Sequence, residues 1–177
     1  MKSYISEYIG TFCLVFCGTG AIIINTIYPN SITHLGISAT FGLIVLAMIY
    51  TIGDISGAHI NPAVTIGFYL SGLISLKNTG IYIIVQCAGA ISASLLLYFF
   101  FPQATTLGET MPTIISYKAF LFEIILTFIL MYVIINVATG VKETGILAGI
   151  AIGSTVLLEA LFAGPVTGAS MNPARSL

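Results

Sequence analysis

A short phrase that occurs twice constrains the fold of this chain more than any other feature. Residues Ser56–Ala63 (SGAHINPA) are echoed by Thr167–Ala174 (TGASMNPA). A second echo has nearly the same offset, because Glu7–Phe12 and Glu123–Phe128 both place a glutamate four residues before Thr-Phe. Two separate matches at a similar offset indicate an internal duplication. The sequence therefore predicts two related units, with the working site where they meet.

The composition is that of a membrane protein. Only 6% of the 177 residues are charged and 58% are hydrophobic, whereas about a quarter of the residues of a soluble domain are charged. The net charge of −1 provides no attraction to nucleic acid. The cysteines lie in apolar runs without metal-ligand spacing, so we expect no metal or cofactor site. We expect the chain to have a lipid bilayer as its partner.

Five apolar runs are long enough to cross a bilayer, which takes about 20 residues of helix. Two shorter apolar segments begin at Asn61 and Asn172 and cannot span. The pattern predicts a single all-α membrane domain over residues 1–177, with one repeat in 1–110 and an incomplete second repeat in 111–177. The five runs are approximately Tyr4–Thr26, Leu35–Ile52, Gly80–Phe100, Tyr117–Ala138 and Gly145–Ala163.

The lysines orient the predicted spans. An N-terminus in the cytoplasm places Lys2, Lys77 and Lys142 inside and leaves Lys118 outside, as the positive-inside rule favours. We therefore expect a multi-pass protein of the cell membrane with a cytoplasmic N-terminus. The first repeat holds three spans, and this odd number inverts the second repeat relative to the first.

The repeated Asn-Pro-Ala triplets have the chemistry of helix starts. Asparagine is a preferred N-cap, and proline suits the first helical position because the N–H that it lacks would have no partner there. In inverted repeats, two such half-helices enter the bilayer from opposite faces and meet near its middle. The triplets comprise Asn61, Pro62 and Ala63 in the first repeat, and Asn172, Pro173 and Ala174 in the second.

The residues before each triplet are small and let irregular backbone line a wet cavity, the one place where membrane-depth backbone can stay unpaired. Their carbonyls would accept hydrogen bonds there, and the asparagine amides would donate. Two helix N-termini add partial positive charge. Such a centre favours neutral hydrogen-bonding molecules over cations and protons. The predicted lining residues are Gly57, Ala58, His59, Gly168 and Ser170.

These motifs, Ser56–Thr65 and Thr167–Ser176 together with Glu7–Phe12 and Glu123–Phe128, resemble those of the major intrinsic protein family, the aquaporins and glycerol facilitators. The resemblance covers the whole chain. It implies an hourglass pore in each subunit, a homotetramer, no cofactor, and passage of water and small neutral solutes. It also implies that Glu7 and Glu123 accept hydrogen bonds from the re-entrant backbone; a proton relay is the alternative for these carboxylates.

The resemblance also implies a selectivity filter of Phe41, Ala160, Ala169 and Arg175. Water-selective members usually have histidine at the position of Ala160, so two alanines imply a wider opening. Glycerol facilitators usually have tryptophan in place of Phe41 and aspartate in place of Ser176, so the chain matches neither group.

The run LFAGP at Leu161–Pro165 is most similar to that of nodulin-type intrinsic proteins and their bacterial relatives. These pass glycerol, urea and uncharged metalloid acids as well as water. His59 is expected either to line the inner vestibule or to be a hydrogen-bonded core residue. Glu159 beside Ala160 departs from the family pattern, and loop backbone and Arg175 are both open to it as partners.

Two other functions are weighed against a channel. A secondary transporter also uses inverted repeats with broken helices, but it needs a site for a coupling ion, and no suitable pair of midplane carboxylates recurs beside the half-helices. An intramembrane enzyme would need a catalytic pattern that the chain lacks, so we expect no enzymatic activity and no catalytic residue.

The position of Leu177, shortly after Arg175, raises the third alternative, an inactive or fragmentary channel subunit without a sixth span. Unsatisfied backbone in hydrocarbon costs several kcal/mol per group. We therefore expect residues Thr167–Leu177 to be poorly ordered and Arg175 not to be held at a pore mouth. Residues Met1–Leu177 alone would then not conduct selectively, unless a neighbouring subunit completes the pore.

Overall fold

The computed structural model describes residues 1–138 and 147–177. The described residues are helical, with no β-strand among them, as the sequence predicts. Five of the helices are long and apolar enough to cross a membrane. The helices are α1 (Lys2–Ile27), α2 (Thr33–Ser56), α3 (Pro62–Leu70), α4 (Leu76–Phe100), α5 (Ser116–Ala138) and α7 (Ala148–Thr167).

The five predicted spans correspond to α1, α2, α4, α5 and α7, and the differences lie at their ends. The last predicted span, Gly145–Ala163, starts outside the described residues. Lys142, one of the lysines that predict the orientation, also lies outside them. Its observed end lies beyond the predicted one, because α7 continues through Pro165 to Thr167.

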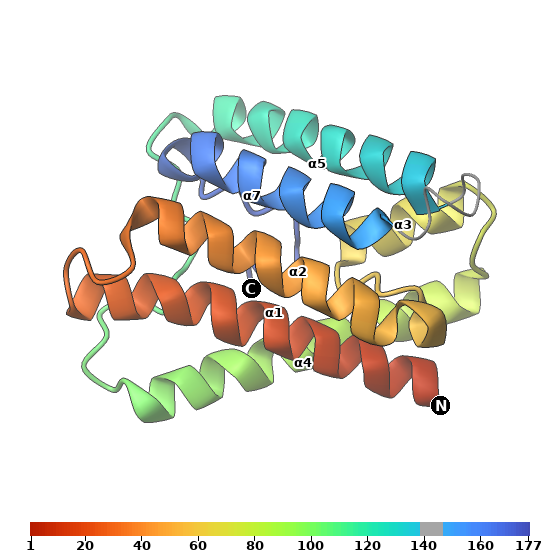
Figure 1. Ribbon diagram of the computed structural model, residues 1–177, viewed down its shortest axis with the longest axis horizontal. Coiled ribbons are helices and arrows are strands. Elements are labelled where there is room, and N and C mark those ends of the chain that lie inside the picture. Colours follow the sequence, from red (N-terminus) through yellow and green to blue (C-terminus); the bar gives the residue numbers. More distant parts are fainter. Residues whose placement is uncertain (139–146) are drawn as a thin grey trace.

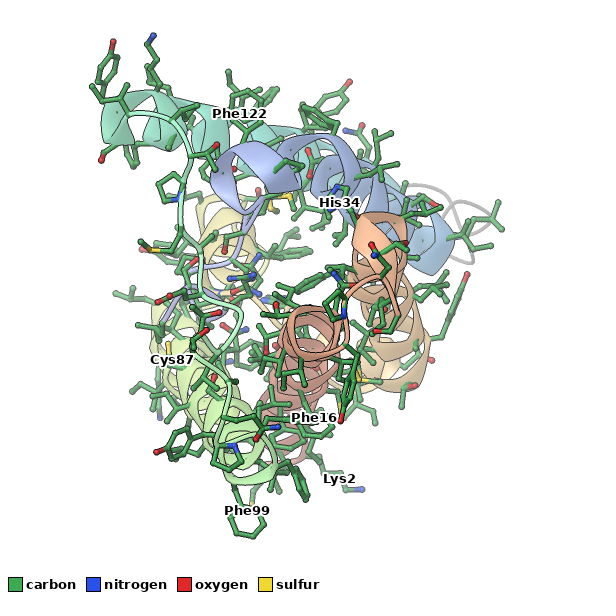
Figure 2. The ribbon with its side chains drawn as sticks, turned by 90° about the vertical axis from the view of Figure 1, so that its left-hand side faces the viewer. Lys2, Phe16, His34, Cys87, Phe99 and Phe122 are labelled. Carbon is green, nitrogen blue, oxygen red and sulfur yellow. The ribbon has the colours of Figure 1, made fainter. Side chains whose placement is uncertain are left out.

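The long helices pack side by side in a fixed order (Figure 1). Helix α1 packs against both α4 and α2, α2 packs against α7, and α7 packs against α5. The short helix α3 contacts α4 and α5, and so lies between the two ends of this series. Viewed along the bundle in Figure 2, the helices surround a central region, and α3 lies in this ring between α4 and α5.

Burial in this bundle is the reverse of that in a soluble protein. The side chains of Glu7, Gln86 and Thr65 are fully buried, whereas large apolar side chains such as Phe128 and Leu95 are exposed. Lipid tails are as apolar as these side chains, so removing them from lipid provides no driving force. The bundle therefore depends on close packing and on hydrogen bonds inside it.

Glycines bring pairs of helices into backbone contact. A Cβ on Gly42 of α2 would lie 2.6 Å from the carbonyl oxygen of Gly153 of α7, and a Cβ on Gly153 would lie equally close to the Gly42 oxygen. On the other side, a Cβ on Gly89 of α4 would overlap the backbone of Tyr8 in α1. Small residues at membrane helix interfaces permit this approach. Helices α2 and α7 run in opposite directions, so the loops that follow them start from opposite ends of the bundle (Figure 1).

Candidate functional site

The two repeated phrases form loops with the same unusual backbone. Helix α2 ends at Gly57 and α7 ends at Gly168, both left-handed with φ of 88°. Positive φ then recurs at Ala58 and Ile60 in the first loop, and at Ala169 and Met171 in the second. Non-glycine residues in this region cost on the order of 1–3 kcal/mol each and persist only where the surroundings hold them. Each loop therefore needs strong partners.

A buried carboxylate supplies those partners in the first loop. One oxygen of Glu7 accepts hydrogen bonds from the backbone N–H of His59 at 2.9 Å and the hydroxyl of Ser56 at 2.7 Å. The other oxygen accepts from the N–H of Ile60 at 2.7 Å and the side-chain amide of Gln86 at 2.8 Å. Hydrogen bonds to a charged acceptor are roughly twice as strong as neutral ones. Glu7 thus holds the strained segment from within the bundle.

Glu123 of α5 holds the second loop in the same way. Its Oε1 accepts from the Thr167 hydroxyl and, at 3.1 Å, from the backbone N–H of Ser170. Its Oε2 accepts from the N–H of Met171 at 2.8 Å. The two glutamates that the sequence echo singled out therefore occupy equivalent places, each bound to the backbone of the loop in its own half of the chain.

The two asparagines meet and exchange hydrogen bonds between the loops. The Asn61 amide donates to the carbonyl of Met171 at 2.7 Å, and the Asn172 amide donates to the carbonyl of Ile60 at 3.0 Å. Each side-chain oxygen accepts from the N–H two residues later in its own segment, at Ala63 and at Ala174, and so acts as a cap. An amide NH₂ carries two hydrogens, which leaves one on each asparagine for a molecule beside it.

Both asparagines border a cavity of about 760 Å³. Most of its wall is apolar, from α2, α5 and α7, and its polar groups come mainly from the two loops. Asp54 and Tyr50 of α2 lie at its border as well. The predicted pore residues that line it are Phe41, Gly57, Ala58, His59, Asn61, Ala160, Ala169, Ser170, Asn172 and Arg175. The loop-binding carboxylates of Glu7 and Glu123 do not line it.

Arg175 is fixed in position, contrary to our expectation. It is buried, its Nη1 donates to the Thr110 hydroxyl at 2.8 Å, and its guanidinium carbon lies 5.5 Å from the centre of the Phe41 ring. The backbone N–H groups of Arg175 and Ser176 bond to the Asn172 carbonyl. The expectation that Arg175 is not held in place was wrong, because Glu123, the Asn172 cap and Thr110 supply hydrogen bonds that hold this segment.

Sequence reasoning missed two supporting residues. Thr110 lies in the connection between α4 and α5, where no motif marks it, and its hydroxyl also bonds to Ser176 at 3.0 Å. Gly18 of α1 leaves room for the Phe41 ring, which a Cβ at this position would overlap. Only a three-dimensional packing argument identifies either of them.

His59 combines both roles that the sequence left open. It lines the cavity, and its ring also stacks on Phe68 with centroids 4.4 Å apart. Its Nδ1 lies 3.2 Å from the Thr65 hydroxyl. Burial lowers the pKa of His59 to about 4, so the imidazole is neutral at physiological pH. The loop therefore presents no cationic side chain at this end of the cavity.

Glu159 has neither of the partners considered for it. Within the part of the chain that the structure describes, both of its carboxyl oxygens are buried without a hydrogen bond. In residues 1–138 and 147–177, no three His, Cys, Asp or Glu side chains gather closely enough to hold a metal ion. Besides Asp54 and Tyr50 at its border, the polar groups of the cavity thus come from the loops, their asparagines and Arg175.

Comparison with known proteins gives concordant matches. The family model described as Major intrinsic protein matches residues 1–177. The chain is 48% identical over 179 residues to "Probable aquaporin NIP4-2" of Arabidopsis thaliana, and the alignment covers 99% of this chain and 62% of that protein. It is 44% identical over 178 residues to "Nodulin-26" of Glycine max, with coverage of 100% and 66%. The chain thus spans a little under two thirds of the length of these curated relatives.

The fold also matches a solved structure. The X-ray structure of the aquaglyceroporin from Plasmodium falciparum superimposes with a TM-score of 0.87 at 28% sequence identity. The match covers 99% of this chain and 78% of that one. The bundle with its two central loops is therefore a known membrane-protein architecture.

The dependence of the second loop on Glu123 can be tested by replacing it with glutamine. Glu123→Gln exchanges one acceptor oxygen for an amide that faces an N–H donor. The free energy of unfolding should fall by about 1.5–3 kcal/mol, the contribution of one hydrogen bond to a charged group. Glu109→Gln, the same change at an exposed carboxylate, is the control. Equal thermal unfolding midpoints for the two variants would show that Glu123 does not hold the loop.

Proposed function

Since the chain belongs to the major intrinsic protein family, whose members are channels and not enzymes, we propose that it conducts water and small neutral solutes and excludes ions and protons. The observation that supports this most strongly is the pair of hydrogen bonds between the loops at the edge of the cavity, from the Asn61 amide to the Met171 carbonyl and from the Asn172 amide to the Ile60 carbonyl. This geometry brings two amide donors together in a largely apolar passage, where a permeating molecule replaces only part of its hydration.

The electrostatics of the cavity favour neutral solutes. Helix α3 begins at Pro62, next to Asn61, and its N-terminus carries a partial positive charge towards the centre. Arg175 adds a full positive charge at the other loop. The buried carboxylates of Glu7 and Glu123 are occupied by loop N–H groups and stand behind the loops. A cation in the passage would therefore meet positive potential without a compensating carboxylate near its centre.

The same arrangement argues against a transporter and against a proton relay. Ion-coupled transport needs a site where a coupling ion gains ligands. Asp54, at the α2 border of the cavity, has no acidic counterpart among the described residues of 111–177 that line the cavity. Glu7 accepts four hydrogen bonds and Glu123 accepts three, so both carboxylates are committed to holding structure.

The proposed filter favours solutes larger than water. Phe41 and Arg175 lie against each other, and the remaining two positions, Ala160 and Ala169, carry only methyl side chains. We propose that glycerol, urea and uncharged metalloid acids of similar size pass with water. The similarity to proteins named as an aquaporin and an aquaglyceroporin supports this range of solutes.

We further propose a cell-membrane protein with a cytoplasmic N-terminus, built from repeats in residues 1–110 and 111–177 and assembled as a homotetramer. Lys2 and Lys77 support the orientation, because they lie at the starts of α1 and α4. The exposed apolar side chains of α4 and α5 suit contact with lipid or with another subunit.

The transport function is tested with the complete protein in proteoliposomes. Water and glycerol permeabilities measured by stopped-flow light scattering should exceed those of protein-free vesicles, and planar bilayers should show no ion current at the same protein density. Accumulation of a solute against its gradient, driven by an ion gradient, would replace this proposal with a transporter.

The proposed filter is tested by Ala160→His. The imidazole adds volume and a hydrogen-bond donor beside Phe41, so glycerol and urea permeabilities should fall more than the water permeability. The ratio of the permeabilities is the readout, because it does not depend on how much protein is incorporated. A parallel loss of all three permeabilities would place Ala160 outside the filter.

A further inference from the structure

The outer end of α7 contains a proline that leaves one carbonyl without its helical partner. In an α-helix, each N–H donates to the carbonyl four residues earlier. Pro165 has no N–H, so the carbonyl of Leu161 loses that hydrogen bond. Leu161 directly follows Ala160, the proposed filter residue. A defect in the helix thus lies one residue from the point where the aperture is set.

A histidine from another helix fills this vacancy. His34 Nε2 lies 2.7 Å from the Leu161 carbonyl oxygen. A carbonyl can only accept, so Nε2 carries the hydrogen and donates it. The two residues lie far apart in the chain, on α2 and α7. The imidazole thus does for Leu161 what the N–H of residue 165 does in an uninterrupted helix.

Gly164 shapes the space for the histidine. A Cβ at this position would lie 3.0 Å from Cε1 of His34, closer than nearly all real side-chain contacts. A larger residue would therefore push the ring away from the carbonyl. Gly164 opens the approach, Pro165 removes the internal donor, and His34 supplies an external one. The three features are complementary, which distinguishes this contact from an incidental surface hydrogen bond.

Helices α2 and α7 pack against each other, and the proposed filter lies between the His34 contact and a crossing of glycines. The two helices run antiparallel (Figure 1). Their backbones touch where Gly42 meets Gly153. Phe41 lies between His34 and Gly42 on one helix, and Ala160 lies between Gly153 and Leu161 on the other. The helix pair is therefore fixed on both sides of these two filter positions.

The end of α7 is also tied to the connection between α4 and α5. The backbone N–H of Thr113 donates to the Val166 carbonyl at 3.0 Å, and its hydroxyl donates to the Pro165 carbonyl at 3.0 Å. These bonds hold the last turn of α7 but do not bind it to α2. His34 alone, among the described hydrogen bonds, connects the last turns of α7 to α2.

We propose that His34 is a positioning residue for the filter: by bonding to the carbonyl that Pro165 leaves free, it sets the separation of Phe41 and Ala160 and thereby the largest solute that passes. This inference rests on the proposed channel function. Without the bond, α2 and α7 remain joined at Gly42 and Gly153 but separate more easily at their outer ends. Glycerol and larger polyols should then gain permeability relative to water.

The test first compares three variants of the complete protein in proteoliposomes by the ratio of glycerol to water permeability. His34→Ala should raise the ratio at least about twofold, the lower limit expected from one net hydrogen bond. His34→Gln, whose amide nitrogen can reach the same carbonyl, should restore most of the original ratio. Leu35→Ala, the exposed neighbouring residue on α2, is the matched control and should leave the ratio unchanged.

The decisive comparison uses Pro165→Ala, which returns an N–H to the helix and gives the Leu161 carbonyl its internal partner. Adding His34→Ala to this background should have no effect on the ratio, because the histidine is then redundant. The same rise in both backgrounds would overturn the proposal, since His34 would act independently of the free carbonyl. An unchanged ratio in His34→Ala would also overturn it.

These outcomes separate the inference from the function on which it rests. If the unmodified protein conducts neither water nor glycerol, the proposed channel function fails before any variant is compared. If it conducts and the His34 variants keep its ratio, the positioning role alone fails. If His34→Ala does not fold, recovery of folding and of the original ratio by added Pro165→Ala supports the proposal, and failure to recover contradicts it.

Discussion

The capture of loop backbone by a buried carboxylate is the interaction on which the rest of this structure depends. Each loop contains non-glycine residues at positive φ, and without partners the chain would relax away from this shape. Glu7 and Glu123 each accept two backbone N–H groups within one loop and so fix the direction of the carbonyls that follow. Only then can the carbonyls of Ile60 and Met171 receive the asparagine from the opposite loop.

This dependence explains why charged residues persist in a chain with so few of them. A carboxylate in a membrane helix is costly unless hydrogen bonds compensate for the water it loses. Here the same hydrogen bonds reduce the cost of burying the carboxylate and the cost of the strained loop, because the loop N–H groups need an acceptor and the carboxylate needs donors. The apolar exterior contributes little to packing, since it faces an apolar solvent. The interior hydrogen bonds and the glycine crossings therefore determine how the helices are arranged.

The sequence predicted the spans, the short helix that begins at Pro62 and the two glutamates, because each of these follows from a local pattern or from the echo between the two phrases. Helix ends were less predictable: α7 runs past Ala163 because His34 and Thr113, which are distant in the chain, support its last turns. Thr110 was not predicted, since its role arises only where a connection folds over Arg175. The expected loss of order around Arg175 was wrong, because Thr110 and Glu123, both distant in the chain, hydrogen-bond to this segment.

The central claim is that Asn61 and Asn172 meet and bond to the opposite loops. Solid-state NMR of the complete protein in bilayers can measure this directly, with ¹⁵N on the Asn61 side chain and ¹³C on the Met171 carbonyl. The Asn61 amide nitrogen lies 2.7 Å from the Met171 oxygen, and the carbonyl bond is about 1.2 Å long. The account therefore predicts strong dipolar dephasing, because the ¹⁵N and ¹³C nuclei are no more than about 4 Å apart. Absence of dephasing in a sample where the labelled Asn61 still caps α3 would contradict it.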